Sequence, residues 1–174
     1  VTALEEEIRT RVEELRKLGV AELVISSLLQ APKPEPSRLT ITKDFRLFLT
    51  DYGNREVKMT VLPKTLYFFY LNHPEGVLFK ELVDYEQELM EYYKLVSNRI
   101  NLLKMYTSIK DLVDPTKNSI NEKASLVRSA FVREFDVEVV KDYIISSDKD
   151  RRKRILIDRK LVVDESGQIL KGER

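Results

Sequence analysis

The stretch that decides the fold is Asn118-Ser-Ile-Asn-Glu-Lys-Ala-Ser-Leu-Val-Arg-Ser-Ala-Phe-Val-Arg-Glu-Phe135, together with the segment that follows it. Its apolar residues recur every three or four positions, which predicts an amphipathic helix over residues 118–135. Two apolar segments, residues 140–145 and 154–163, come next and are predicted as a pair of strands. The tip between them is Asp148-Lys-Asp-Arg-Arg-Lys-Arg154, in which five of seven residues are cations. The sequence therefore predicts a helix followed by a β-hairpin with a basic tip.

The segments before this stretch divide the chain. Residues 3–18 have the spacing of an amphipathic helix, and residues 21–29 are predicted as a second, more apolar short helix. The run Ala31-Pro-Lys-Pro-Glu-Pro-Ser37 contains three prolines at alternate positions, which excludes helix and inner strand. We therefore predict a helical segment over residues 1–30, a proline-rich linker over 31–37, a domain over 38–165 and a polar tail over 166–174.

The predicted domain begins with extended structure and continues with helices. Alternating apolar residues over 39–61 predict a small antiparallel sheet of two or three short strands. The expected elements after it are helices near 62–71, 80–96 and 98–113, with a turn at 72–76 and a short extended piece at 77–79. This order predicts an α+β fold.

Composition excludes several classes of protein. The chain has 174 residues, 43% of them hydrophobic, which is enough for a folded domain with a core. It lacks cysteine, and its single histidine, His73, precedes Pro74 in a turn, so we expect a structural histidine and no metal site. No nucleotide-binding loop or nucleophile motif occurs, so neither an enzyme nor a cofactor is expected. No run approaches the roughly 20 apolar residues of a membrane helix, and a cytoplasmic location is expected.

The predicted helix 118–135 has two distinct sides. Its core side consists of apolar residues: Ile120, Ala124, Val127, Phe131 and Phe135. Its start and outward side carry the candidate contacts, which are Lys117, Asn118, Asn121, Ser125, Arg128, Ser129 and Arg133. Asn and Arg can make paired hydrogen bonds to base edges in a DNA major groove, and Ser permits close approach. The same pattern also describes a solvated helix face, so both interpretations stay open.

The hairpin tip carries the second set of candidate contacts, which are Lys149, Arg151, Arg152, Lys153 and Arg154. Adjacent like charges repel, so a fold has little structural reason to gather them on one turn. Cations placed in this way can neutralise phosphates of a nucleic acid. The alternative is an exposed turn kept soluble by its charge, because the net charge of the whole chain is only +1.

The order of elements resembles the DNA-binding output domain of OmpR/PhoB-type response regulators, a winged-helix family. The resemblance lies in Arg38-Leu-Thr-Ile41, in Asn54-Arg-Glu-Val-Lys-Met-Thr-Val-Leu-Pro-Lys-Thr-Leu66, and in Phe68-Phe-Tyr-Leu-Asn-His-Pro-Glu-Gly-Val-Leu-Phe-Lys-Glu-Leu82. It covers about residues 38–163. It implies a winged helix, with helix 118–135 in the major groove of double-stranded DNA and the basic wing 148–154 on the backbone. A bacterial transcriptional regulator is the expected function.

Two departures from the family pattern bear on partners. The first is the helical segment, which stands where a receiver domain would precede the module. Its residues 3–29 have an apolar stripe that either packs on its own domain or pairs with a second copy as a homodimer. The second is residues 97–117, which replace a loop that contacts RNA polymerase in the family. A protein-interaction module without DNA binding, which uses these two regions, is the alternative function.

Overall fold

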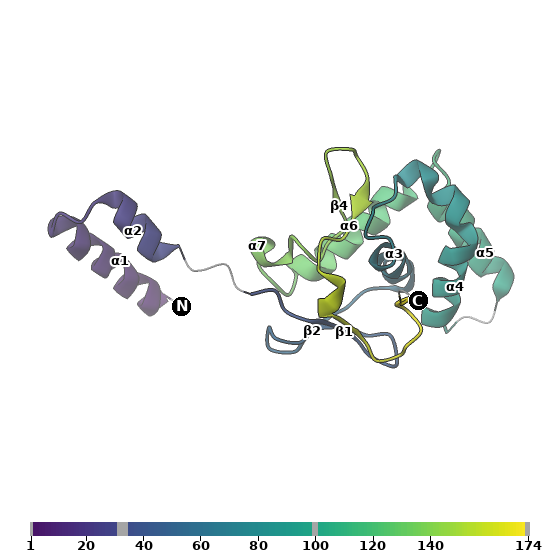
Figure 1. Cartoon of the computed structure of the whole chain (residues 1–174), viewed down its shortest axis with the longest axis horizontal. Helices are drawn as coiled ribbons and strands as arrows, with labels where there is room; N and C mark the ends of the chain where they lie inside the picture. Colours follow the sequence, from purple (N-terminus) through teal and green to yellow (C-terminus); the bar gives the residue numbers. More distant parts are fainter. Residues whose placement is uncertain (1, 31–34, 99–100, 173–174) are drawn as a thin grey trace. The chain divides into compact units, whose positions relative to one another are not determined.

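The computed structural model describes residues 2–30, 35–98 and 101–172 (Figure 1). By its internal contacts the chain divides into two compact units, Val1–Glu35 and Pro36–Arg174. Residues 31–34, which contain two prolines of the predicted linker, lie outside the described residues. Each unit is described by itself below.

The first unit is a helical hairpin. Helix α1 spans Thr2–Lys17 and helix α2 spans Glu22–Leu29, which confirms both predicted helices. Gly19 joins them with a positive φ of 76°, a conformation that glycine adopts without steric cost. The guanidinium of Arg16 donates two hydrogen bonds to the carboxylate of Glu22, at 2.7 and 3.1 Å, across this turn.

The second unit contains a four-stranded mixed sheet of order β3-β2-β1-β6. Its strands are β1 (Leu39–Ile41), β2 (Leu47–Leu49), β3 (Arg55–Val57) and β6 (Val162–Asp164). The first three pair antiparallel, as predicted, and β6 adds to β1 in parallel. Alternate residues of β1 and β2 are completely buried, so one face of the sheet covers the core.

The helical elements of this unit are α3 (Val61–Leu71), the 3-10 helix η1 (Phe79–Tyr85), α4 (Glu86–Val96), α5 (Leu102–Val113), α6 (Ser119–Val132) and α7 (Val137–Val140). Helices α4 and α6 pack against α3, and α5 packs against α4, α6 and η1 (Figure 1). Every residue from Leu66 to Leu71 is buried, which explains the density of aromatic residues there. The tyrosines of this run serve the core and are not available for stacking on nucleic-acid bases. The unit therefore has the predicted α+β fold.

The predicted strand over residues 140–145 is wrong. This segment contains the end of α7 and a turn, and the strand pair is much shorter: β4 (Ser146–Ser147) and β5 (Lys153–Arg154). Val140, Tyr143 and Ile144 are buried together at helical spacing, because the chain is curled there and not extended. The predicted strand 154–163 is likewise interrupted by a 3-10 helix, η2 (Arg159–Leu161), before β6.

Two further expectations need correction. The predicted helix 80–96 begins as the 3-10 helix η1, and only its second half is α-helical. The predicted polar tail also packs on the body: Ile169 is completely buried, and the amide of Asn72 donates to its carbonyl oxygen at 2.8 Å. The carboxylate of Asp164 accepts from the backbone N–H groups of Ile169 and Leu170 at 2.7 and 3.0 Å. The apolar pair Ile169-Leu170 is the signal in the sequence for this packing.

Arg159 joins the end of α3 to the segment that leads into β6. Its guanidinium donates to the carbonyl oxygens of Leu71 at 2.7 Å and of Tyr70 at 3.1 Å. It also donates to the carbonyl oxygens of Ile155 at 2.9 Å and of Ile157 at 2.6 Å. The last carbonyl groups of a helix have no hydrogen-bond donor within the helix. At the end of α3, the side chain of Arg159 donates to two of them. Arg159 thereby positions both α3 and the chain that follows the hairpin.

Candidate nucleic-acid interface

The β4–β5 hairpin closes around the basic tip. Ser146 pairs with Arg154, and Ser147 pairs with Lys153. The backbone N–H of Asp148 donates to the carbonyl of Arg152 at 3.0 Å, and the N–H of Arg151 donates to the carbonyl of Asp148 at 3.0 Å. Arg151 has a φ of 64°, a left-handed conformation that costs a non-glycine residue about 1–2 kcal/mol. An arginine therefore occupies the turn position that glycine would fill most cheaply.

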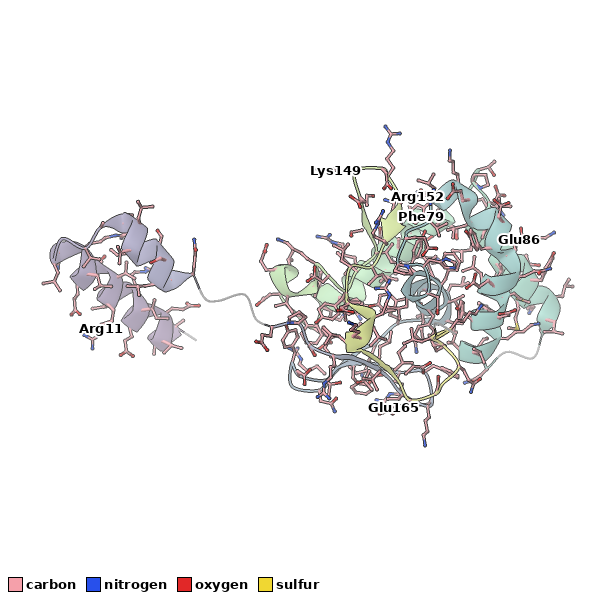
Figure 2. The ribbon with its side chains drawn as sticks, viewed as in Figure 1. Arg11, Phe79, Glu86, Lys149, Arg152 and Glu165 are labelled. Carbon is pink, nitrogen blue, oxygen red and sulfur yellow. The ribbon has the colours of Figure 1, made fainter. Side chains whose placement is uncertain are left out.

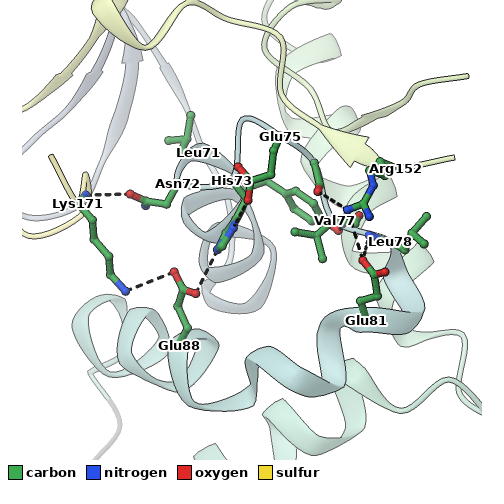
Figure 3. A network of polar contacts seen from close by, with 12 residues as sticks. Leu71, Asn72, His73, Glu75, Val77, Leu78, Glu81, Glu88, Arg152 and Lys171 are labelled. Carbon is green, nitrogen blue, oxygen red and sulfur yellow. Dashed lines mark hydrogen bonds and ion pairs between the residues drawn. The ribbon is translucent and has the colours of Figure 1, made fainter. Parts of the chain in front are cut away.

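The base of the hairpin is fixed to the turn between α3 and η1 (Figure 3). Val77 and Lys153 exchange two backbone hydrogen bonds, at 3.0 and 3.1 Å. The guanidinium of Arg152 donates to the carbonyl of Gly76 at 3.0 Å and lies 3.6 Å from the carboxylate of Glu81. Gly76 permits this approach, because a Cβ there would lie 3.0 Å from the Cβ of Arg152. The orientation of the hairpin relative to α3 is thus set by backbone contacts.

Three of the five predicted tip cations take part in holding the hairpin. Arg152 binds Gly76, Arg154 forms ion pairs with Asp148 at 3.2 Å and with Asp150 at 3.4 Å, and the ammonium of Lys153 lies 4.9 Å from the ring centroid of Phe79. The clustering of these three cations therefore has a structural reason that the sequence did not reveal.

The remaining two tip cations, Lys149 and Arg151, are exposed. Neither forms an ion pair within the described ranges 2–30, 35–98 and 101–172. Figure 2 shows Lys149 on the hairpin, with Arg152 and Phe79 nearer the body. Lys149 and Arg151 are therefore the tip cations that a polyanion can reach without disturbing the hairpin.

The structure places the predicted contacts of α6 on its exposed side. Exposed residues are Lys117, Asn118, Asn121, Ser125, Arg128, Ser129 and Arg133. The opposite side is core, as predicted: Ile120, Val127 and Phe131 are buried, and Ala124 and Phe135 are partly buried against them. Lys117 pairs with Asp111, whereas Arg128 and Arg133 form no ion pair among the residues that the structure describes. The predicted polar face exists, with Arg128 and Arg133 as its unpaired cations.

Phe79 connects the hairpin to the start of α6. Besides its contact with Lys153, it lines a pocket of about 390 Å³. Its other lining residues include Lys80, Val113, Lys117, Asn118 and Asn121. Phe79 therefore contacts the hairpin residue Lys153 and also lines the pocket at the start of α6. The pocket is also lined by the exposed cation Lys80, which the sequence pattern indicated only as the start of a helix.

The positive charge of this surface is moderated by acids. Asp148 and Asp150 lie in the hairpin, Asp111 pairs with Lys117, and Glu122 of α6 pairs with Lys123 at 2.9 Å. Exposed ion pairs of this kind contribute at most about 1 kcal/mol each, so a phosphate can replace a carboxylate at little cost. The surface therefore carries separate exposed cations among acids and no uniform positive charge.

His73 belongs to a second polar network, which joins the turn after α3 to helix α4 (Figure 3). Its two ring nitrogens lie 2.8 Å from Glu75 and 3.1 Å from Glu88, and its ring packs on Phe69 with centroids 4.3 Å apart. The ammonium of Lys171 also reaches Glu88, at 3.3 Å. Within the described residues, no group of three or more metal-binding side chains occurs. These contacts give His73 the structural setting that was expected.

The network makes stability depend on pH. Burial alone would lower the pKa of His73, but its hydrogen bonds with Glu88 and Glu75 outweigh this effect and raise the pKa above its ordinary value. Protonated His73 therefore stabilises the fold below the ordinary value of about 6.5, and this contribution is lost as pH rises through the folded-state pKa. We expect the free energy of unfolding to fall over this window, and His73→Gln to remove that part of the fall. Urea unfolding at several values across about pH 6 to 9 measures the free energy of unfolding of the wild type and of His73→Gln. The same pH dependence in both proteins would contradict the expectation.

Comparisons of the chain with protein-family models, with curated proteins and with solved structures find no match. Among the described residues, no helix combines the length and the apolar character that crossing a membrane requires. Conclusions about function therefore depend on the geometry of the surface described above.

Proposed function

We propose that the second unit is a winged-helix DNA-binding domain, and that the chain is a bacterial transcriptional regulator or a part of one. The observation that carries the proposal is the backbone pairing of Val77 with Lys153. It gives the order helix α3, a β-bridge residue at Val77, helices η1, α4, α5, α6 and α7, and a hairpin that pairs back to Val77. With α5 as an insertion, this order supports a winged helix, in which the hairpin follows the recognition helix.

In this proposal, α6 lies in the major groove. Arg128 and Asn121 would reach base edges from its exposed side, and Ser125 and Ser129 would allow close approach. Lys80 and Lys117, which line one pocket, would contact phosphates beside the start of α6. Lys149 and Arg151 would grip the backbone or the minor groove from the hairpin tip.

A second candidate function is protein recognition without DNA binding. Helix α5 supports this second function for two reasons. It shows that the region 97–117 contains a helix, and the exposed side of this helix is apolar. Leu102, Leu103 and Tyr106 are exposed to 60%, 76% and 47%. Exposed apolar patches of this kind are typical of interaction sites. The same helix would bind a partner such as RNA polymerase in a DNA-binding regulator, so the two candidates differ only in whether DNA is bound.

Direct binding to DNA distinguishes the two candidates. We expect the chain to bind a fluorescently labelled, mixed-sequence duplex of about 30 base pairs at about 50 mM salt, with affinity that falls steeply as salt rises. Arg128→Ala should weaken binding by about 1–3 kcal/mol when a preferred sequence is present. Lys94→Ala is the matched control, because Lys94 lies on α4 beside Tyr106 and outside the proposed surface. No change in anisotropy at low salt would refute DNA binding and favour protein recognition.

A further inference from the structure

Within its own unit, the helical hairpin α1–α2 leaves most of its apolar surface uncovered. Among residues 2–30 only Ile25 is buried. Large apolar side chains of both helices are exposed: Leu4 at 65%, Ile8 at 48%, Leu23 at 85%, Val24 at 48%, Leu28 at 67% and Leu29 at 55%. Helix α2 has no charged residue after Glu22, so it offers no polar side to water except two serines. A helix of this composition is stable only when another surface covers it.

The unit is also too small to supply that cover itself. It comprises residues 1–35, and domains below about 40 residues usually need oligomerisation, metals or disulfides for stability. Cysteine is absent from the chain. A lipid surface is a poor partner, because helices that lie on membranes have basic polar faces. Helix α1 instead carries five glutamates and four arginines and lysines. A protein surface of matching charge remains.

The charges of α1 are distributed so that a second α1 provides this match. Residues 2–8 contain three glutamates, Glu5, Glu6 and Glu7, and no cation. Residues 9–17 contain four cations and two glutamates. An antiparallel partner places the acidic half of each helix against the basic half of the other, whereas a parallel partner places like charges together. A surface that matches itself in this way is what a twofold symmetric dimer requires.

We propose that two copies of the chain associate through their α1–α2 hairpins, with the two α1 helices antiparallel. Ile8 and Val12 of one copy would face Val12 and Ile8 of the other near the twofold axis. Leu4 would pack toward Leu15 of the partner copy, and α2 would cover the outer part of the same core. The proposal concerns the first unit alone and is independent of DNA binding by the second.

The mass of the chain in solution tests the association. The chain has a mass of 20.4 kDa, and sedimentation velocity at micromolar concentration should give twice that value. Ile8→Glu should convert the dimer to a monomer, because it places a charge in the apolar contact. Thr10→Glu adds the same charge about 200° away on the same helix and should leave the dimer intact. A monomeric wild-type chain, or a dimer that persists in Ile8→Glu with unchanged helix content by circular dichroism, would overturn the proposal.

Crosslinking tests the relative orientation of the two α1 helices. Because the chain has no cysteine, only an introduced cysteine can react. With 1.5 Å rise per residue, two copies of residue 4 lie about 18 Å apart along an antiparallel pair, too far for a disulfide. Ile8→Cys lies close to the centre of α1 and should link to itself through a short bismaleimide, to which both cysteine thiols add. Leu4→Cys should not link to itself, but should link to Leu15→Cys when the two variants are mixed. Equal self-linking at positions 4 and 8 would indicate parallel helices and overturn the proposed arrangement.

Discussion

Lys149→Ala combined with Arg151→Ala is expected to weaken binding to duplex DNA about 10- to 100-fold at low salt, with no loss of fold stability. Each cation that contacts a phosphate contributes on the order of 1 kcal/mol and releases counterions, so the salt slope should also fall by about 1.8. The pair is chosen because both residues are exposed and form no ion pair in the described part of the chain. Fluorescence anisotropy at several salt concentrations measures affinity and slope together.

The conformation of Arg151 supplies the control for this experiment. Because its φ is 64°, Arg151→Gly should leave the free energy of unfolding unchanged or raise it by up to about 1 kcal/mol, while it weakens DNA binding. Arg151→Lys retains both the charge and the strain, and should bind DNA nearly as well as the wild type. Replacing Arg152 instead would also remove its hydrogen bond with Gly76, so that an effect on folding could not be separated from an effect on DNA binding. Unchanged DNA affinity and slope in the Lys149/Arg151 double variant would rule out the hairpin as a DNA-contacting wing.

Arg159→Ala is expected to lower the free energy of unfolding by about 3–5 kcal/mol, a large part of the total stability of an ordinary domain. The guanidinium donates to the carbonyl oxygens of Leu71, Tyr70, Ile155 and Ile157, at 2.6 to 3.1 Å. Without it, the partly buried carbonyl oxygens of Leu71, Ile155 and Ile157 lose this donor together, whereas that of Tyr70 still accepts from the backbone N–H of His73 at 3.3 Å. Arg159 also connects two segments 88 positions apart, so its loss should affect the whole unit.

Two variants make this expectation sharp. Arg159→Lys keeps the positive charge but cannot present the planar set of donors, and should fall between the wild type and the alanine variant. Lys160→Ala changes the exposed neighbour of Arg159 and should stay within about 0.5 kcal/mol of the wild type. Urea unfolding followed by circular dichroism gives the three values. A loss below about 1 kcal/mol for Arg159→Ala would mean that water satisfies these carbonyls equally well.

Helical spacing was the most reliable signal in the chain. It predicted the existence of α1, α2, α5 and α6, and for α6 it also separated the buried side from the exposed side. The candidate residues on α6 were predicted correctly as exposed. In a regular helix, burial of the apolar stripe leaves the opposite, polar stripe facing solvent. Whether they contact DNA remains a prediction.

Short extended segments were predicted less well. Residues 140–145 are apolar and partly β-branched, which favours a strand, but the chain curls there so that Val140, Tyr143 and Ile144 meet the core together. The 3-10 helix η1 and the addition of β6 to β1 depend on contacts with distant residues, and local preference does not encode such contacts. The contacts of Arg152 and Lys153 also involve distant residues. The sequence alone therefore could not distinguish the tip cations that hold the hairpin from Lys149 and Arg151.

The sequence by itself determined the α+β class, the helices with clear apolar stripes, and the presence of a basic hairpin after an amphipathic helix. These properties are local, because they follow from residue spacing and turn chemistry within one segment. Only the tertiary structure decided that Val77 pairs with Lys153, that Arg159 joins α3 to the chain after the hairpin, and that Arg152, Lys153 and Arg154 hold the hairpin in place. Such contacts join residues that are mostly far apart in the chain, and their partners are defined only when the core has packed.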